Sequence, residues 1–137
     1  MACNAEIQLE QLGRKPERVK IGDWLPLRHH SMSGKLITSI SLPANIKLAY
    51  EYIARTPADQ PIVCAAIGQW ESGRTRLALG GWGSGPILAF DGPSSDGIEI
   101  AAQDAYSTAE DEWASAEYRL EMAGVLSWRC LQRLYPG

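Results

Sequence analysis

Apolar and polar residues alternate in several short stretches of the first two thirds of the chain, which is the pattern of half-buried β-strands. Over residues 5–12, Ile7 and Leu9 alternate with glutamines and glutamates. The turn-forming segment GRKPE follows, and residues 18–21 can return beside the first strand. We therefore predict an N-terminal β-hairpin, followed by a linker over residues 22–34, where no periodicity is visible.

Further strand patterns follow the linker, where the composition changes. They cover residues 35–42, 46–54, 61–70, 75–81 and 86–90. The second of them places Leu48, Tyr50 and Tyr52 on one face. The third, PIVCAAIGQW, is continuously apolar, as expected of a strand that is covered on both faces.

Two stretches of helical spacing close the chain. The first has an apolar stripe of Ile98, Ala101, Ala102, Ala105, Tyr106 and Ala109. Asp96 and Glu99 at its start have the spacing of a capping box. The second helix is expected from about Ser115 to Tyr135.

The second helix has one broad face that is mostly apolar, made of Leu120, Ala123, Gly124, Ser127, Leu131 and Leu134. Its opposite face mixes charged and apolar residues: Arg119, Glu121, Arg129, Arg133, Met122, Val125 and Leu126. The apolar residues among them suggest that part of this outer face is covered.

Strands followed by helices, without βαβ alternation, predict an α+β fold. We expect an antiparallel β-sheet of about four strands backed by the C-terminal helices, with the N-terminal β-hairpin as an appendage. Residues 1–33 would form the hairpin and linker, and residues 34–137 the main domain.

Composition excludes several classes of protein. The 137 residues include 45% apolar and 21% charged residues, as in an ordinary globular domain, and the net charge of −3 gives no sign of a nucleic-acid surface. The longest apolar run is far shorter than the roughly 20 residues of a membrane span, and the N-terminus lacks a signal-peptide pattern. Three widely spaced cysteines argue against disulfides and metal clusters, so we expect a cytoplasmic protein that binds no nucleic acid and no membrane.

The segment RLALGGWGSGPILAF raises the question of phosphate binding, because it holds four glycines in six positions. A P-loop needs a Lys after its last glycine, whereas Pro86 follows here and no Lys or Arg lies between Arg76 and Arg119. A dinucleotide-binding loop must open a helix, whereas PILAF has the pattern of a strand. We predict a tight corner between two strands, for which glycine is suited.

Other candidate chemistry is weak. His29 and His30 would point in opposite directions in an extended linker, and no residue at ligand spacing accompanies them. The acidic run AEDEW, residues 109–113, is expected to be a solvated junction between the helices. No nucleophile lies in a known catalytic motif. The residues alone therefore predict no complete active site and no metal site.

Two longer segments carry a resemblance to a known family. The family is that of the molybdenum hydroxylases, which includes carbon monoxide dehydrogenase and xanthine dehydrogenase. The C-terminal domain of its FAD-binding subunit has two segments similar to TRLALGGWGSGPILA and DEWASAEYRLEMAGVLSWRCLQRL of this chain. GKLITSISLP and AYEYIARTPAD resemble upstream segments of that domain in order and spacing. The resemblance covers about residues 34–134.

The resemblance implies a fold and a place in a larger enzyme. In that family the FAD-binding subunit passes electrons from iron–sulfur clusters to an acceptor, and molybdenum chemistry occurs in another subunit. The loops that hold the FAD pyrophosphate lie in an N-terminal domain, and residues 1–33 resemble only the end of that domain. We therefore expect a shortened, C-terminal fragment that neither binds FAD nor catalyses a reaction alone.

Tyr52 and Arg55 are the candidate cofactor-binding residues, because the family places their strand nearest the flavin domain. Members often have a basic pair here; Arg55 is retained, and Thr56 replaces the second residue. The ordinary alternatives are a core position for Tyr52 and a surface ion pair for Arg55.

The alternative function is a stand-alone interaction or dimerisation module without catalysis. The apolar face of Ile7 and Leu9 needs cover, and Met122, Val125 and Leu126 form a second patch. We therefore expect a homodimer through the N-terminal strands. Within a parent complex, the partners would be molybdenum and iron–sulfur subunits.

Overall fold

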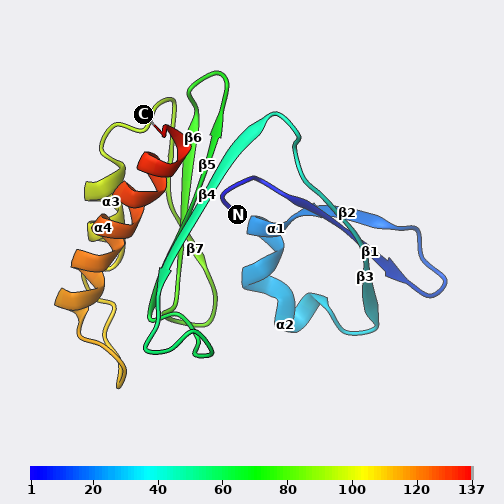
Figure 1. Ribbon diagram of the computed structural model, residues 1–137. Helices are drawn as coiled ribbons and strands as arrows, with labels where there is room; N and C mark the ends of the chain where they lie inside the picture. The colour runs from blue at the N-terminus through cyan, green and yellow to red at the C-terminus, as the bar shows by residue number, and fades with distance from the viewer. Residues whose placement is uncertain (137) are drawn as a thin grey trace.

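Within residues 1–136, which the computed structural model describes, seven strands form two antiparallel sheets (Figure 1). The larger sheet has the order β4-β5-β6-β7. Its strands are β4 (Ile46–Ile53), β5 (Val63–Trp70), β6 (Thr75–Gly80) and β7 (Ile87–Gly92). The helices α3 (Ile98–Ala105) and α4 (Ala116–Leu134) cover one face of this sheet. The predicted α+β fold is thereby confirmed.

The smaller sheet contains the predicted hairpin and one strand more. β1 (Glu6–Gln11) lies between β2 (Glu17–Lys20) and β3 (Lys35–Ser41). Sequence patterns group β3 with the larger sheet, but its hydrogen bonds join it to β1. The chain passes from β3 into β4 through the short turn 42–45, so that one extended segment contributes a strand to each sheet (Figure 1).

The segment expected to be an aperiodic linker is helical instead. α1 (Ile21–Trp24), the 3-10 turn η1 (Leu25–Leu27) and α2 (Arg28–Ser31) follow one another directly. The hairpin residues Ile7 and Leu9 are only 1% and 2% exposed. The apolar face that was expected to need external cover is therefore buried within its own chain.

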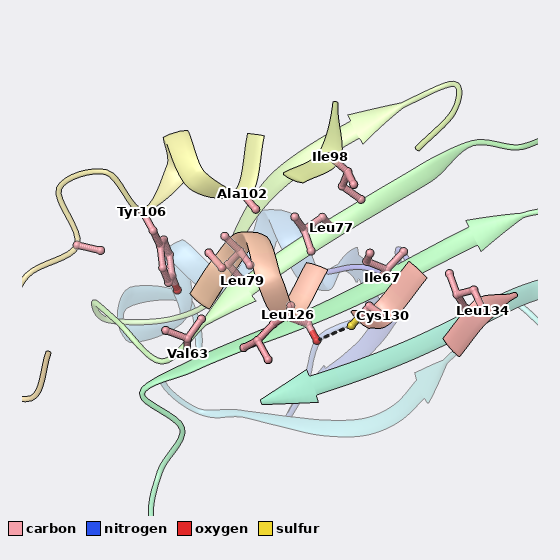
Figure 2. Packing of buried hydrophobic residues seen from close by; sticks show 13 residues of the cluster. Val63, Ile67, Leu77, Leu79, Ile98, Ala102, Tyr106, Leu126, Cys130 and Leu134 are labelled. Atoms are coloured by element: carbon pink, nitrogen blue, oxygen red, sulfur yellow. Dashed lines mark hydrogen bonds between the residues drawn. The ribbon is translucent and has the colours of Figure 1, made fainter. Parts of the chain in front are cut away.

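The main core lies between the larger sheet and the two helices (Figure 2). Its buried side chains include Val63, Ile67, Leu77, Leu79, Ile98, Ala102, Tyr106, Leu126, Cys130 and Leu134. Each large apolar side chain buried here contributes about 1.5–3 kcal/mol. Leu126, expected on the outer face of α4, is 1% exposed and belongs to this core, because α3 and the sheet both pack against α4.

Cys130 lies at the centre of this core, where its thiol donates to the carbonyl oxygen of Ala65 at 3.5 Å (Figure 2). Burial raises the pKa of the Cys130 thiol to about 11. The thiol is therefore protonated at neutral pH. This agrees with the prediction of unpaired cysteines in the chain.

The two helices begin differently from each other. Ser115 caps α4, its hydroxyl accepting from the backbone N–H of Tyr118 at 3.2 Å. Residue Gly97, with φ +78°, precedes α3, and no side chain caps that helix. The predicted capping box of Asp96 and Glu99 is therefore wrong. The Asp96 carboxylate instead accepts from the Ser94 hydroxyl at 2.8 Å.

The glycine-rich segment forms a corner between β6 and β7, as predicted. Gly81 has φ +98°, and a Cβ there would lie 2.6 Å from the carbonyl oxygen of Ile62. Only glycine fits this conformation and this close approach without strain. An Arg28 Nη2 donates to the Ser84 carbonyl, so α2 is attached to the same corner.

Candidate functional site

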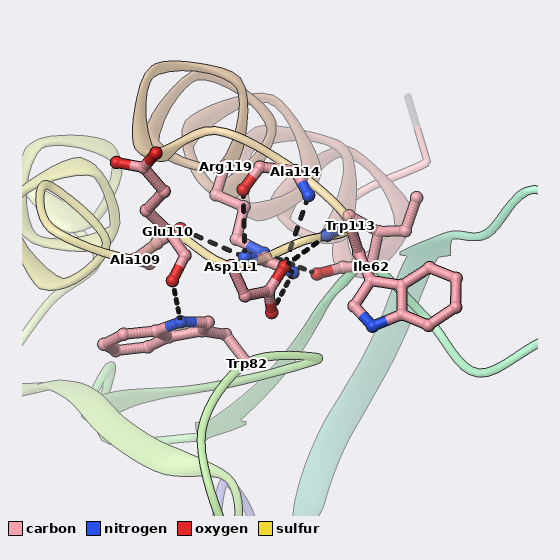
Figure 3. Close-up of polar contacts among 8 residues, drawn as sticks. All are labelled: Ile62, Trp82, Ala109, Glu110, Asp111, Trp113, Ala114 and Arg119. Atoms are coloured by element: carbon pink, nitrogen blue, oxygen red, sulfur yellow. Dashed lines mark hydrogen bonds and ion pairs between the residues drawn. The ribbon is translucent and has the colours of Figure 1, made fainter.

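Arg119 organises one end of the larger sheet (Figure 3). Its Nε donates to the Ile62 carbonyl at 3.2 Å, and its Nη1 to the carbonyls of Ala109 and Ala114 at 3.1 and 3.3 Å. Its Nη2 donates to both carboxylate oxygens of Asp111 at 2.9 Å. All three nitrogens of this guanidinium therefore donate to groups of the chain.

Arg119 was expected on the outer face of the second helix, but only 1% of the residue is exposed. Its neighbours explain how a charge is tolerated there. A buried guanidinium is stable when it is paired with a carboxylate and each donor has an acceptor. The carbonyl of Ile62 belongs to the connection between β4 and β5, and those of Ala109 and Ala114 to the connection between α3 and α4. Arg119 therefore joins these two connections.

Asp111 is exposed, as expected of a solvated junction, but hydrogen bonds hold its carboxylate in place. Its Oδ1 also accepts from the backbone N–H groups of Trp113 and Ala114 at 2.8 and 3.2 Å. Partial desolvation opposes ionisation of this carboxyl. The hydrogen bonds from Arg119 and from the two backbone groups together outweigh it and lower the pKa of Asp111. The acidic run is therefore a structured turn.

Trp82 links the glycine corner to the same junction. Its indole Nε1 donates to the Glu110 carbonyl at 3.2 Å (Figure 3). Its ring also meets the ring of Tyr106 edge-on, with 6.0 Å between centroids. The corner, the junction and α4 consequently form one connected wall.

A pocket of about 320 Å³ opens beside this wall. It is lined by Arg55, Asp59, Gln60, Pro61, Ile62, Gly81, Trp113 and Arg119. The Arg55 guanidinium lies over the Trp113 ring, 4.4 Å from its centroid. The Asp59 carboxylate accepts from the backbone N–H of Thr56 at 3.1 Å, which holds the loop after β4. The arginine, an acid, an amide and an aromatic ring thus meet in one cavity.

A second candidate surface is the tyrosine face, which we define as Leu48, Tyr50 and Tyr52 on β4. Alternate residues Ala49 and Ile53 pack against the core, so the tyrosine face points away from α3 and α4. Tyr50 and Tyr52 are 49% and 48% exposed, and their rings stack with 5.8 Å between centroids. Desolvation raises the pKa of Tyr50 to about 12, so its hydroxyl is neutral at ordinary pH.

The structure does not bring the two sequence-predicted site residues into one pocket. Tyr52 lies on the tyrosine face, paired opposite Cys64, whereas Arg55 lines the pocket beside Trp113. The ordinary alternatives are also corrected. Tyr52 is half exposed and not a core residue. Arg55 contacts an aromatic ring, and no ion pair to it is formed among residues 1–136.

No group of three or more histidines, cysteines or carboxylates in residues 1–136 could hold a metal ion. His29 and His30 are exposed on the helical turn α2, not in an extended linker. No helix within the same residues is long and apolar enough to cross a membrane.

No protein-family model and no curated protein matches this chain. Solved structures do. The chain is 24% identical to a chain of CO dehydrogenase from Oligotropha carboxidovorans, with a TM-score of 0.76 over 97% of this chain and 53% of that one. It is 19% identical to a chain of quinoline 2-oxidoreductase from Pseudomonas putida 86, with a TM-score of 0.67 and the same coverages.

A chain of carbon monoxide dehydrogenase from Hydrogenophaga pseudoflava is similar as well, at 20% identity and a TM-score of 0.68. At these identities the likeness demonstrates a shared fold. The match includes both sheets and the helices, because almost the whole chain is aligned. The chain spans about half the length of each of these structures.

Proposed function

We propose that this chain is the C-terminal part of the FAD-binding subunit of a molybdenum-dependent dehydrogenase. The observation that carries the proposal is the TM-score of 0.76 to a CO dehydrogenase chain over 97% of this chain. Another similar structure is described as a Cu,Mo-CO dehydrogenase. The sequence segments around the glycine corner and α4, which resemble the same family, support the assignment independently.

In this proposal the chain has an electron-transfer role in the parent enzyme and is not catalytic alone. FAD would be held mainly by the flavin domain, and the molybdenum and iron–sulfur centres by partner subunits. A cytoplasmic location follows from the same assignment. The described residues of this chain contain no glycine-rich loop that opens a helix, which is the usual pyrophosphate cradle.

The tyrosine face is our candidate for the side that meets the flavin. Two stacked, half-exposed rings offer a flat apolar surface, as a flavin ring system requires. Tyr52 is retained from the sequence prediction, and Tyr50 joins it because the two rings are in contact. Arg55 lies in a separate pocket, so we assign it a different role below.

A reconstitution experiment tests this function. The chain would be co-expressed with the flavin domain of a similar CO dehydrogenase subunit, and bound FAD measured by absorbance after purification. We expect a stable, flavin-containing complex, and a redox potential that shifts in Tyr52→Ala. Tyr135→Ala is the matched control, because Tyr135 is similarly exposed, at 55%, but lies directly after α4. Failure to form a flavin-containing complex with any such domain would contradict the proposal.

The alternative is a stand-alone interaction or dimerisation module. The exposed tyrosine face favours it, since unpaired apolar patches commonly mark interaction surfaces. The hairpin and Leu126 no longer argue for a homodimer, because both are covered within the chain. Sedimentation at tens of micromolar would give about twice the 15.0 kDa chain mass for a dimer. In that case Tyr50→Ser should weaken it.

A further inference from the structure

Two arginines of this chain show what a guanidinium does here when it has a carboxylate beside it. Arg74 lies over the Trp70 ring at 5.5 Å, and its Nε and Nη2 donate to the two oxygens of Asp91 at 3.0 and 2.8 Å. Arg119 contacts both oxygens of Asp111 through its Nη2 alone. In each case the guanidinium binds a carboxylate of its own chain, and in Arg74 it does so through the edge formed by two of its nitrogens.

Arg55 has the stacking partner but not the carboxylate. Its guanidinium lies 4.4 Å from the centre of the Trp113 ring, closer than the Arg74–Trp70 pair. No carboxylate of residues 1–136 lies within ion-pair distance of it. Stacking fixes the plane of a guanidinium and leaves its N–H edge available for a planar oxyanion. Arg55 is therefore pre-arranged for such a ligand.

The surrounding pocket limits the shape of that ligand. Pro61, Ile62 and the indole of Trp113 provide apolar surface, and Gly81 contributes no side chain to the wall. The other arginine in the wall, Arg119, is only 1% exposed, and its Nε, Nη1 and Nη2 already donate to groups within the chain. A volume of about 320 Å³ is at the small end of the range for small-molecule sites.

The charge balance limits the ligand further. Asp59 also lines the pocket, and its negative charge disfavours a dianion such as phosphate. A single carboxylate on a flat apolar body satisfies both requirements, because its charge can meet Arg55 while its ring contacts Trp113 and Pro61.

We propose that the Arg55–Trp113 pocket binds the carboxylate of a small aromatic acid. Arg55 binds the carboxylate through two parallel N–H···O bonds, and Trp113 contacts the ring. Asp59 selects for a monoanion. This site is separate from the tyrosine face and does not depend on the chain's being part of a flavoprotein.

Titration calorimetry with benzoate as the probe tests the proposal. We expect saturable binding at millimolar concentration, and at least about tenfold weaker binding by Arg55→Gln. Arg74→Gln is the matched control, since it removes a second stacked arginine and should leave benzoate binding unchanged. Asp59→Asn, which can still accept from Thr56, should bind benzoate more tightly. Arg55 and Asp59 are exposed residues, so these variants should keep the fold, as circular dichroism can verify.

Three further probes test which features of benzoate the pocket recognises. Benzamide has the shape of benzoate without the charge, inorganic phosphate has more charge, and N-acetyl-glutamate amide presents a carboxylate as a partner protein would. We expect each to bind at least about tenfold more weakly than benzoate. Equal binding of benzamide, tighter binding of either other probe, an unchanged affinity in Arg55→Gln, or no benzoate binding at ~10 mM would overturn the proposal.

Discussion

Arg119 illustrates how a residue is selected by the number of its hydrogen-bond donors. Lysine has the same charge, but its three donors point from one atom and cannot reach three carbonyls and a carboxylate together. We expect Arg119→Lys to lower the free energy of unfolding by about 2–4 kcal/mol, because buried carbonyl groups lose their donors. Urea denaturation measures this. Arg129→Lys, on the exposed face of α4, should change stability by less than about 0.5 kcal/mol.

The Asp111 carboxyl gives stability a defined dependence on pH. Its pKa in the folded protein is lowered, whereas an unfolded Asp titrates near pH 3.9. The ionised form therefore contributes its stabilisation fully above about pH 5, and the contribution is lost as pH falls through the lowered pKa. We expect the difference in unfolding free energy between the protein and Asp111→Asn to be constant from about pH 5 to 7 and to decrease below that range. A difference that grows on acidification would contradict this assignment.

The role of Arg119 could have been found in the sequence, but charge alone misleads. Arg119, Ala123, Leu126, Cys130 and Leu134 recur at spacings of three and four, which is one stripe of a helix. All five are buried. The partners of Arg119, in contrast, are mostly backbone carbonyls from distant segments, and no residue pattern encodes them. Its burial was thus predictable in principle, whereas its contacts were not.

At the scale of elements, the glycine corner offers a direct test of why its glycines are needed. Gly81→Ala would combine a left-handed backbone with a Cβ 2.6 Å from the Ile62 carbonyl oxygen. We expect a loss of about 2–4 kcal/mol in stability, since strain and displacement of the β4–β5 connection add together. Gly83→Ala is the matched control. Gly83 has φ +75° but no atom within 4 Å of the added methyl, so the loss should be about 1 kcal/mol.

Strands and helices were predictable individually because their signals are local. Alternation identified β1 and β4, the continuous apolar run identified β5, and Ser115 marked the start of α4. The sheet to which β3 belongs was not predictable, since strand pairing depends on distant segments. The linker was also misread, because α1 and α2 are single helical turns too short to show a period.

At the scale of the whole molecule, we expect the chain alone to bind no FAD. A flavin requires most of its surface to be enclosed, and the tyrosine face presents only one open side. Titration with FAD, followed by flavin fluorescence, measures this directly. A stoichiometric complex of micromolar affinity would contradict the expectation and would also require a pyrophosphate site that we have not identified.

The thiol of Cys130 has a practical consequence for measuring how the helix layer separates from the sheet. It is 0% exposed at the interface between α4 and β5, and its pKa of about 11 suppresses thiolate formation. An alkylating reagent can reach it only when α4 detaches, while the partly exposed Cys3 can react in the closed molecule. Mass spectrometry after timed alkylation would therefore resolve two kinetic classes. The rate of the slow class, which is the alkylation of Cys130, would measure how fast the core opens, with no probe engineered into the protein.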